Sequence, residues 1–118
     1  MISMREAYEK IGANYDGACA RLMGGEMLAR FALKFLDDES MDKLEAAMAA
    51  GDAEEAFMAA HTLKGVSQNL GFDNLYEPAV VVTEALRGAD AVDGAREGMH
   101  ALQQQYAATM SALREAAE

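Results

Sequence analysis

The sequence predicts an all-α protein, an antiparallel up-down four-helix bundle with additional short helices at the N-terminus. Good helix formers are abundant among the 118 residues, which include nine Met but only one Pro. Apolar residues recur three and four positions apart over long segments, and short turns separate those segments. Long amphipathic helices joined by short turns pack as antiparallel neighbours. We therefore expect one domain over residues 1–118, with a bundle core over about 26–117.

Two short helices are expected before the bundle core. Ser3 and Glu6 have the spacing of a capping box and predict a first helix that ends near Gly12. A second helical segment, residues 14–23, ends where two consecutive glycines interrupt the pattern.

The core is expected to begin with one helix over residues 26–36 and another over residues 40–50. Four apolar residues of the first lie within about 100° of one another on a helical wheel, so this helix is amphipathic. Ser40 is expected to cap the second helix, and Gly51 to end it. The expected apolar faces are Met27, Leu28, Phe31 and Phe35 in the first helix, and Met41, Leu44 and Met48 in the second.

A longer helix is expected over residues 52–70, with a length of about 28 Å from the helical rise per residue. Asp52 and Glu55 form a capping-box pair at its start, and Gly71 ends it. Its predicted core face consists of Ala56, Ala59, Leu63, Val66 and Leu70.

Two further helices complete the predicted fold. Asp73 is expected to cap a helix that extends to Arg87, and Pro78 to kink this helix or to disturb its first turns. The last helix is expected from about Asp90 to the C-terminus. The predicted apolar stripes are Leu75, Ala79, Val82 and Leu86 in the former, and Val92, Ala95, Met99, Leu102, Tyr106, Met110 and Leu113 in the latter.

Charge and cysteine content narrow the classes of partner. Twenty acidic residues against ten basic ones give a net charge of −10, which disfavours nucleic acid and anionic membranes as partners. The single cysteine, Cys19, excludes an internal disulfide and a Cys-cluster metal site. No apolar run is long enough to cross a bilayer, and the start lacks a signal-peptide pattern. We therefore expect a cytoplasmic protein.

His61 is expected on the solvent face of its helix, opposite the core face. Phe57 lies one turn before it, Lys64 and Gly65 lie one turn after it, and Gln68 lies two turns after it. A neutral imidazole is a nucleophile near physiological pH, and an ammonium three residues away can reach the oxygens of a phosphoryl group on it. The cluster is therefore suited to carrying a phosphoryl group.

Gly65 calls for a separate explanation, because a glycine in a helix interior costs about 0.5–1 kcal/mol relative to alanine. Four residues after His61, a bare backbone would let a partner's surface approach the imidazole closely. For such a pair taken alone, a tolerated glycine beside a solvated histidine is the simpler interpretation.

The string from Ala60 to Gly71, AHTLKGVSQNLG, resembles the signature of histidine-containing phosphotransfer (HPt) domains of phosphorelays. The match covers His, Leu, Lys, Gly, a small residue at Ser67, Leu and Gly at the family's spacings. Through the helical bundle, the resemblance extends to nearly the whole chain. It implies that His61 accepts a phosphoryl group from a receiver-domain aspartate and passes it to another response regulator.

The resemblance also implies roles for the neighbours of this histidine. Lys64 would stabilise the phosphate, Gly65 would leave room for the docked receiver, and Leu63 and Leu70 would hold the helix to the bundle. Further binding residues are expected at Phe57, Met58, Gln68 and Thr83.

Thr83 stands where many relatives have a glutamine or glutamate that hydrogen-bonds the histidine ring from the adjacent helix. A threonine is shorter. Either Thr83 reaches His61 through its hydroxyl or a water, or the ring is held less firmly than in those relatives.

The partners implied by the resemblance are response-regulator receiver domains and a hybrid sensor histidine kinase, and the implied oligomeric state is a monomer. Mg²⁺ is expected on the partner receiver domain, and no cofactor or metal is expected on this chain. The sequence contains no Gly-rich phosphate loop or Walker motif, so we expect no autonomous kinase activity.

Two alternatives have a basis in the sequence. One is an interaction-only helical bundle, a degenerate HPt that binds a receiver or kinase without phosphotransfer. Its surface would consist of Phe57, Met58, Val80 and Val81. The other is a carboxylate-bridged metal bundle, because Glu97 and His100 have the required i, i+3 spacing. A second such pair is absent and His100 lies off the apolar stripe, so a solvated histidine is favoured.

Overall fold

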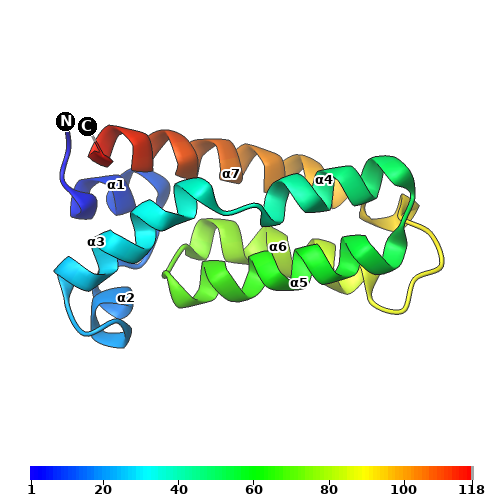
Figure 1. The fold of residues 1–118 in the computed structure, drawn as a ribbon, viewed down its shortest axis with the longest axis horizontal. Coiled ribbons are helices and arrows are strands. Elements are labelled where there is room, and N and C mark those ends of the chain that lie inside the picture. Colours follow the sequence, from blue (N-terminus) through cyan, green and yellow to red (C-terminus); the bar gives the residue numbers. More distant parts are fainter. Residues whose placement is uncertain (118) are drawn as a thin grey trace.

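The computed structural model describes residues 1–117, which form seven α-helices and two 3₁₀ turns (Figure 1). The predicted all-α class is therefore confirmed. The helices are α1 (Met4–Ile11), α2 (Tyr15–Arg21), α3 (Gly25–Lys34), α4 (Ser40–Ala50), α5 (Ala53–Asn69), α6 (Asp73–Leu86) and α7 (Arg96–Ala117). The 3₁₀ turns are Phe35–Asp37 and Asp93–Ala95. Glu118, the end of the predicted last helix and domain, lies outside the described residues.

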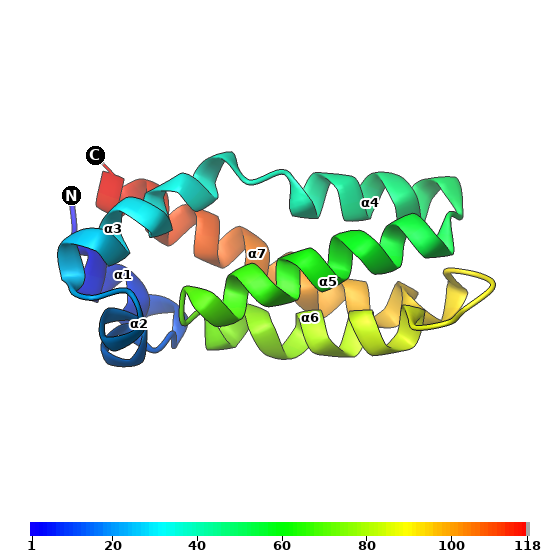
Figure 2. The same cartoon turned by 60° about the horizontal axis from the view of Figure 1, so that its bottom comes forward.

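Helices α4 to α7 lie lengthwise in an elongated molecule of 42 × 24 × 20 Å (Figures 1 and 2). Helix α5 packs between α4 and α6, and α6 also packs against α7. Helices α3 and α4 follow one another along the same direction, with a break between them, while α1 packs against α7 where the two chain ends lie close together. Helix α5 therefore has helices on both flanks and leaves one outer face uncovered.

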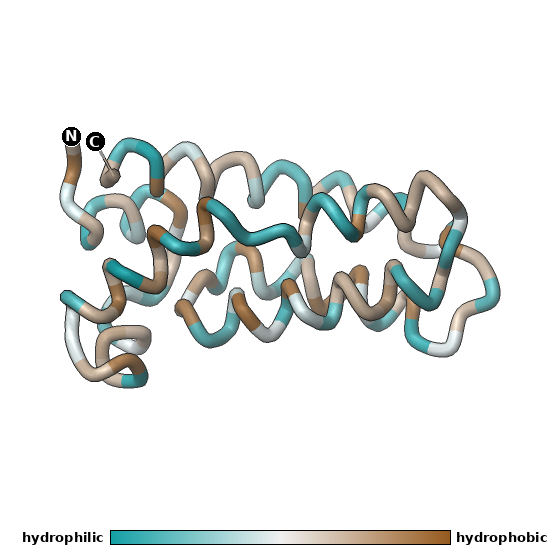
Figure 3. The backbone as a smooth tube through the Cα atoms, in the orientation of Figure 1, coloured by the Kyte–Doolittle hydropathy of each residue, from teal (hydrophilic) through white to brown (hydrophobic). Residues whose placement is uncertain are grey.

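The core consists of apolar side chains from all seven helices. Hydrophobic and hydrophilic positions are interspersed along the helices (Figure 3). Fully buried leucines occur at positions 28, 44, 63, 75, 102 and 113. Among residues 1–117, no helix combines the length and the hydropathy that crossing a membrane requires.

The predicted helix ends are mostly confirmed. The Ser3 side chain accepts a hydrogen bond from the Glu6 amide, and the Glu6 side chain accepts one from the Ser3 amide, as in a capping box. Asp52 accepts a hydrogen bond from the Glu55 amide at the start of α5. Gly51 ends α4 with a left-handed φ of 73°, which a glycine adopts without steric cost.

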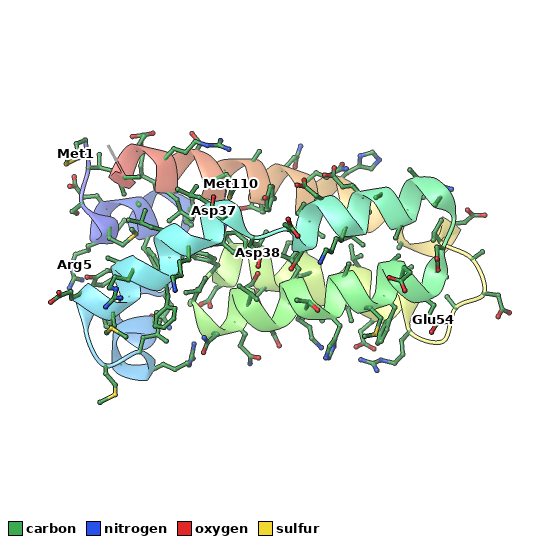
Figure 4. All side chains as sticks on the ribbon, viewed as in Figure 1. Met1, Arg5, Asp37, Asp38, Glu54 and Met110 are labelled. Carbon is green, nitrogen blue, oxygen red and sulfur yellow. The ribbon has the colours of Figure 1, made fainter. Side chains whose placement is uncertain are left out.

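Two predicted caps are each wrong by one residue. Ser40 is the first residue of α4 rather than its cap, and its amide donates to Asp38 Oδ1 at 2.8 Å (Asp38 is labelled in Figure 4). Asp73 is likewise the first residue of α6, with Phe72 at the cap position and no side-chain capping bond. Serine and aspartate are common both at caps and in first turns, so their presence alone leaves the boundary uncertain by a residue.

The predicted apolar face of the segment 26–36 is also corrected. Leu28 and Phe35 are buried as expected, but Met27 and Phe31 are 37% and 39% exposed, and Ala32 is buried in their place. Because α3 buries a narrow line of residues spaced four and three apart, bulkier apolar residues beside that line stay partly in solvent.

The other apolar stripes are confirmed, with differences in detail. The predicted faces of α4 and α6 are buried, and α6 continues through Pro78 without a break. The predicted stripe of the last helix is buried except for Tyr106, which is half-buried. Helix α7 begins at Arg96 instead of about Asp90, because residues 93–95 form a 3₁₀ turn.

The N-terminal helices close the end of α5. The Tyr8 hydroxyl donates to the Leu70 carbonyl at 2.6 Å, and the Asn14 amide donates to the Gly71 carbonyl at 2.7 Å. From the end of α2, the Arg21 guanidinium donates to the carbonyls of Gln68 and Asn69. The last carbonyls of a helix lack hydrogen-bond donors within that helix. The N-terminal segment supplies such donors at the end of α5.

Candidate functional site

The outer face of α5 carries the predicted site. The helix buries Ala56, Ala59, Ala60, Leu63, Ser67 and the following Leu70 against the bundle, and Val66 is half-buried. The predicted core face is therefore confirmed, apart from the partial exposure of Val66 and the two additional small residues. His61 lies on the opposite side and is exposed to solvent.

The imidazole of His61 stacks on the ring of Phe57, one turn earlier in α5. The two ring centroids are 5.9 Å apart, and the ring planes differ by 21°. Phe57 is half-buried and packs against the core, whereas His61 is exposed. The structure thus brings together two of the residues that sequence reasoning selected.

Lys64 and Gly65 continue this outer face by one turn. Lys64 is half-buried, and Gly65 is exposed. A Cβ atom added at Gly65 would have no heavy atom of the described chain within 4 Å, apart from the glycine's own helix backbone and chain neighbours. Nothing in the packing of the free protein therefore requires a glycine at this position.

Gln68 lies at the end of the face, beside a surface depression of about 510 Å³. The depression is lined by Arg21, Gly65, Val66, Gln68 and Asn69. On the other flank, the 56% exposed Met58 borders a groove between α4 and α5. The predicted binding residues of α5 thus occupy one uninterrupted side of the helix.

Thr83 is not brought to His61. Its side chain is fully buried, and its hydroxyl donates to the Ala79 carbonyl at 2.7 Å. The packing of α6 turns position 83 inward together with Val82 and exposes Glu84 instead. A direct hydroxyl contact between Thr83 and His61, one of the expected possibilities, is therefore absent from the free protein.

Val81 also lies apart from the surface expected around Phe57 and Met58. It is 58% exposed and lies next to α7, where a Cβ atom added at Gly98 would be 3.4 Å from Val81. Val81 therefore lies on the α7 side of α6, whereas Val80, the other α6 residue of the expected surface, is half-buried.

Two residues near the site were missed, Glu84 in the last turn of α6 and Arg87 directly after this helix. Arg87 donates two hydrogen bonds to Glu84, at 3.1 and 3.0 Å, and its guanidinium carbon lies 5.1 Å from the centroid of the Phe57 ring. These hydrogen bonds lower the pKa of Glu84, and the positive charge of Lys64 lowers it further. The i, i+3 spacing of Glu84 and Arg87 was visible in the sequence, but their position opposite Phe57 depends on the register between α5 and α6.

The site contains one histidine, one lysine and an acid–base pair, and this set suits the binding of an anionic group rather than a metal. In residues 1–117, no group of three or more His, Cys, Asp or Glu side chains is placed to hold a metal ion. His100, the second histidine, is exposed on α7.

A family model described as "Hpt domain" matches residues 36–116. This range contains α4, α5, α6 and nearly all of α7, and it begins after α3. No curated protein and no solved structure matches the chain.

Proposed function

Because this chain belongs to the Hpt domain family, whose members act in phosphorelays with receiver and kinase components, we propose that His61 accepts and donates a phosphoryl group. The observation that carries the proposal is the exposed imidazole on the uncovered face of α5, with Lys64 and Gly65 one turn away. The proposal takes α4 to α7 as an antiparallel up-down bundle whose role is to present this face.

The reaction is a displacement at phosphorus. A lone pair on one ring nitrogen of neutral His61 attacks the phosphorus of a receiver's aspartyl phosphate, the N–P bond forms, and the acyl P–O bond breaks. The aspartate carboxylate leaves with the electron pair. Transfer to a second receiver is the reverse of this step, so the chain acts as a carrier and needs no ATP site.

Lys64 and Gly65 have different parts in this proposal. The Lys64 ammonium offsets the negative charge that the phosphoryl group adds to a chain whose net charge is already −10. Gly65 leaves space for the receiver's surface, in keeping with the open environment of its Cα atom. Phe57, Met58 and Gln68 would contact the docked receiver around this centre.

The partner supplies the remaining chemistry. The receiver domain would hold the Mg²⁺ that offsets charge on the transferring phosphoryl group. We infer that the carrier is a cytoplasmic monomer that exchanges phosphate with response-regulator receivers and a hybrid sensor histidine kinase.

The proposal is tested by incubating the full chain with receiver domains that carry labelled aspartyl phosphate. We expect label on the wild type and on His100→Gln, and none on His61→Gln. The His100 variant is the matched control because it removes the other exposed histidine. Label on the His61 variant would refute the assignment of the acceptor.

The exposed Met58 side chain favours a second candidate, an interaction-only Hpt bundle. Such a protein would bind a receiver or kinase and leave its phosphate in place. Receivers that bind the chain tightly but transfer no label to it would support this candidate over the carrier.

A further inference from the structure

The orientation of the His61 ring needs a physical cause that Thr83 does not supply. The Thr83 hydroxyl is bound to the Ala79 carbonyl, and within residues 1–117 no hydrogen bond or ion pair reaches the imidazole. An exposed histidine without a directing contact samples several rotamers. The side chain that does contact the ring is Phe57, through the stack of the two ring planes.

We propose that Phe57 is the positioning residue of His61, and that the Glu84–Arg87 pair on α6 holds Phe57 in place. We call Phe57, Glu84 and Arg87 the aromatic brace. The inference rests on the proposed function, because positioning matters only if His61 reacts. The stacking itself, however, belongs to the unphosphorylated protein and can be tested there.

The stack between Phe57 and His61 has the geometry of an attractive aromatic pair. A centroid separation of 5.9 Å lies within the usual range for such pairs, and the 21° angle makes the rings nearly parallel. A stack restricts rotation of the imidazole without using either ring nitrogen. One nitrogen of His61 therefore stays free to carry the proton, and the other stays free to attack phosphorus.

Phe57 is itself restrained from two directions. Its inner edge packs against the core of the bundle. The Arg87 guanidinium lies 5.1 Å from the ring centroid, as in a cation–π contact, and two hydrogen bonds to Glu84 fix the guanidinium. Helix α6 thus positions His61 through an aromatic ring.

The brace predicts a specific kinetic effect. Group transfer requires the attacking nitrogen to be aligned with phosphorus. A displacement of the reacting group by about 1 Å can lower the rate on the order of 100-fold. Loss of the stack would leave the imidazole present but mobile. We therefore expect the rate of transfer within the complex to fall by a larger factor than the affinity for the receiver, to which Phe57 contributes only one of several contacts.

The first test uses NMR of the full, unphosphorylated chain. The ring current of Phe57 displaces the carbon-bound proton signals of the His61 ring, so we expect Phe57→Leu to shift these signals and to increase ring motion. Phe57→Tyr keeps an aromatic ring and should retain the wild-type signals. Phe31→Leu, a matched change at an exposed phenylalanine of α3, should leave them unchanged. Unchanged His61 signals in Phe57→Leu would overturn the inference.

The second test measures transfer from a labelled receiver as a function of receiver concentration. For Phe57→Leu we expect kcat to fall on the order of tenfold and Phe57→Tyr to restore it; KM should change by a smaller factor, because leucine keeps an apolar contact for the receiver. A raised KM with unchanged kcat would show that Phe57 only contacts the partner, and would overturn the positioning role. If the wild type took no label at all, the carrier proposal would fail, while the NMR result would still decide whether Phe57 orients the ring.

Discussion

The Tyr8 hydroxyl in α1 donates a 2.6 Å hydrogen bond to the Leu70 carbonyl at the end of α5. The two residues are 62 positions apart in the chain, and both are buried. Burial raises the pKa of the Tyr8 phenol, which therefore stays protonated and remains a donor over the physiological pH range. This bond joins the N-terminal segment to the helix that carries His61.

Tyr8→Phe should lower the free energy of unfolding by about 1–2 kcal/mol, because a buried carbonyl loses its partner while the ring packing is kept. Urea denaturation of the full chain measures the change. Tyr76→Phe is the control, since the Tyr76 hydroxyl makes no hydrogen bond within the described residues, and it should alter stability by less than about 0.5 kcal/mol. Equal effects of the two variants would contradict the role given to the Leu70 contact.

Gly71→Ala should destabilise the fold more than Gly88→Ala. Both glycines have left-handed φ angles, 72° and 64°, so both substitutions carry a backbone cost of about 1–2 kcal/mol. Only at Gly71 would the new Cβ lie 2.6 Å from the Asn14 carbonyl oxygen, whereas at Gly88 it would meet open space. Thermal denaturation of both variants measures the difference, which is the steric cost of the Asn14 contact at Gly71. Similar losses of stability in the two variants would show that the chain around Asn14 adjusts without cost.

Gly65→Ala and Gly65→Gln should stabilise α5 and impair transfer in order of side-chain size. The free chain leaves room for a side chain at this position, so removal of a helix-interior glycine should add about 0.5–1 kcal/mol. Docking of a receiver against α5 should suffer, most strongly in Gly65→Gln, as a rise in KM. If Gly65→Gln were more stable and transferred phosphate at the wild-type rate, the access role of Gly65 would be wrong.

Lys64→Gln should shorten the lifetime of phosphorylated His61, because a nearby positive charge stabilises the added phosphoryl group. We expect roughly a tenfold faster loss of label, on the scale of one charge-assisted hydrogen bond. Lys43→Gln removes an exposed lysine of α4 that pairs with Glu39 at 3.8 Å, and it should leave the lifetime unchanged. A lifetime that responds equally to both variants would point to net charge rather than to the position of Lys64.

The parts of the fold that sequence predicts well are those where periodicity is strong. The core face of α5 and the stripe that includes Leu75 and Val82 in α6 follow directly from apolar spacing, because burial of a helix selects one side. The start of α7 is less predictable. Residues 93–95 are compatible with a helix by composition, and only the packing makes them a 3₁₀ turn.

For the candidate site, the sequence identified the residues on α5 but not those that approach from α6. Spacing along one helix places Phe57 near His61 whatever the rest of the fold does. Between two helices, an axial rotation of one residue decides whether Thr83 or Glu84 points outward, and no pattern within either helix encodes that rotation. The same limit explains why the contact of Arg87 with Phe57 required the structure.

The hydrogen bonds from Tyr8, Asn14 and Arg21 to the end of α5 limit how far the domain can be truncated at its N-terminus. The segment that the family shares begins at residue 36, but the donors that satisfy the final carbonyls of α5 lie before that point. A fragment trimmed to the shared segment would leave those carbonyls to water, and the last turns of α5, near Gly65, would fray. The smallest piece that keeps the His61 face intact is therefore larger than the piece by which the family is recognised.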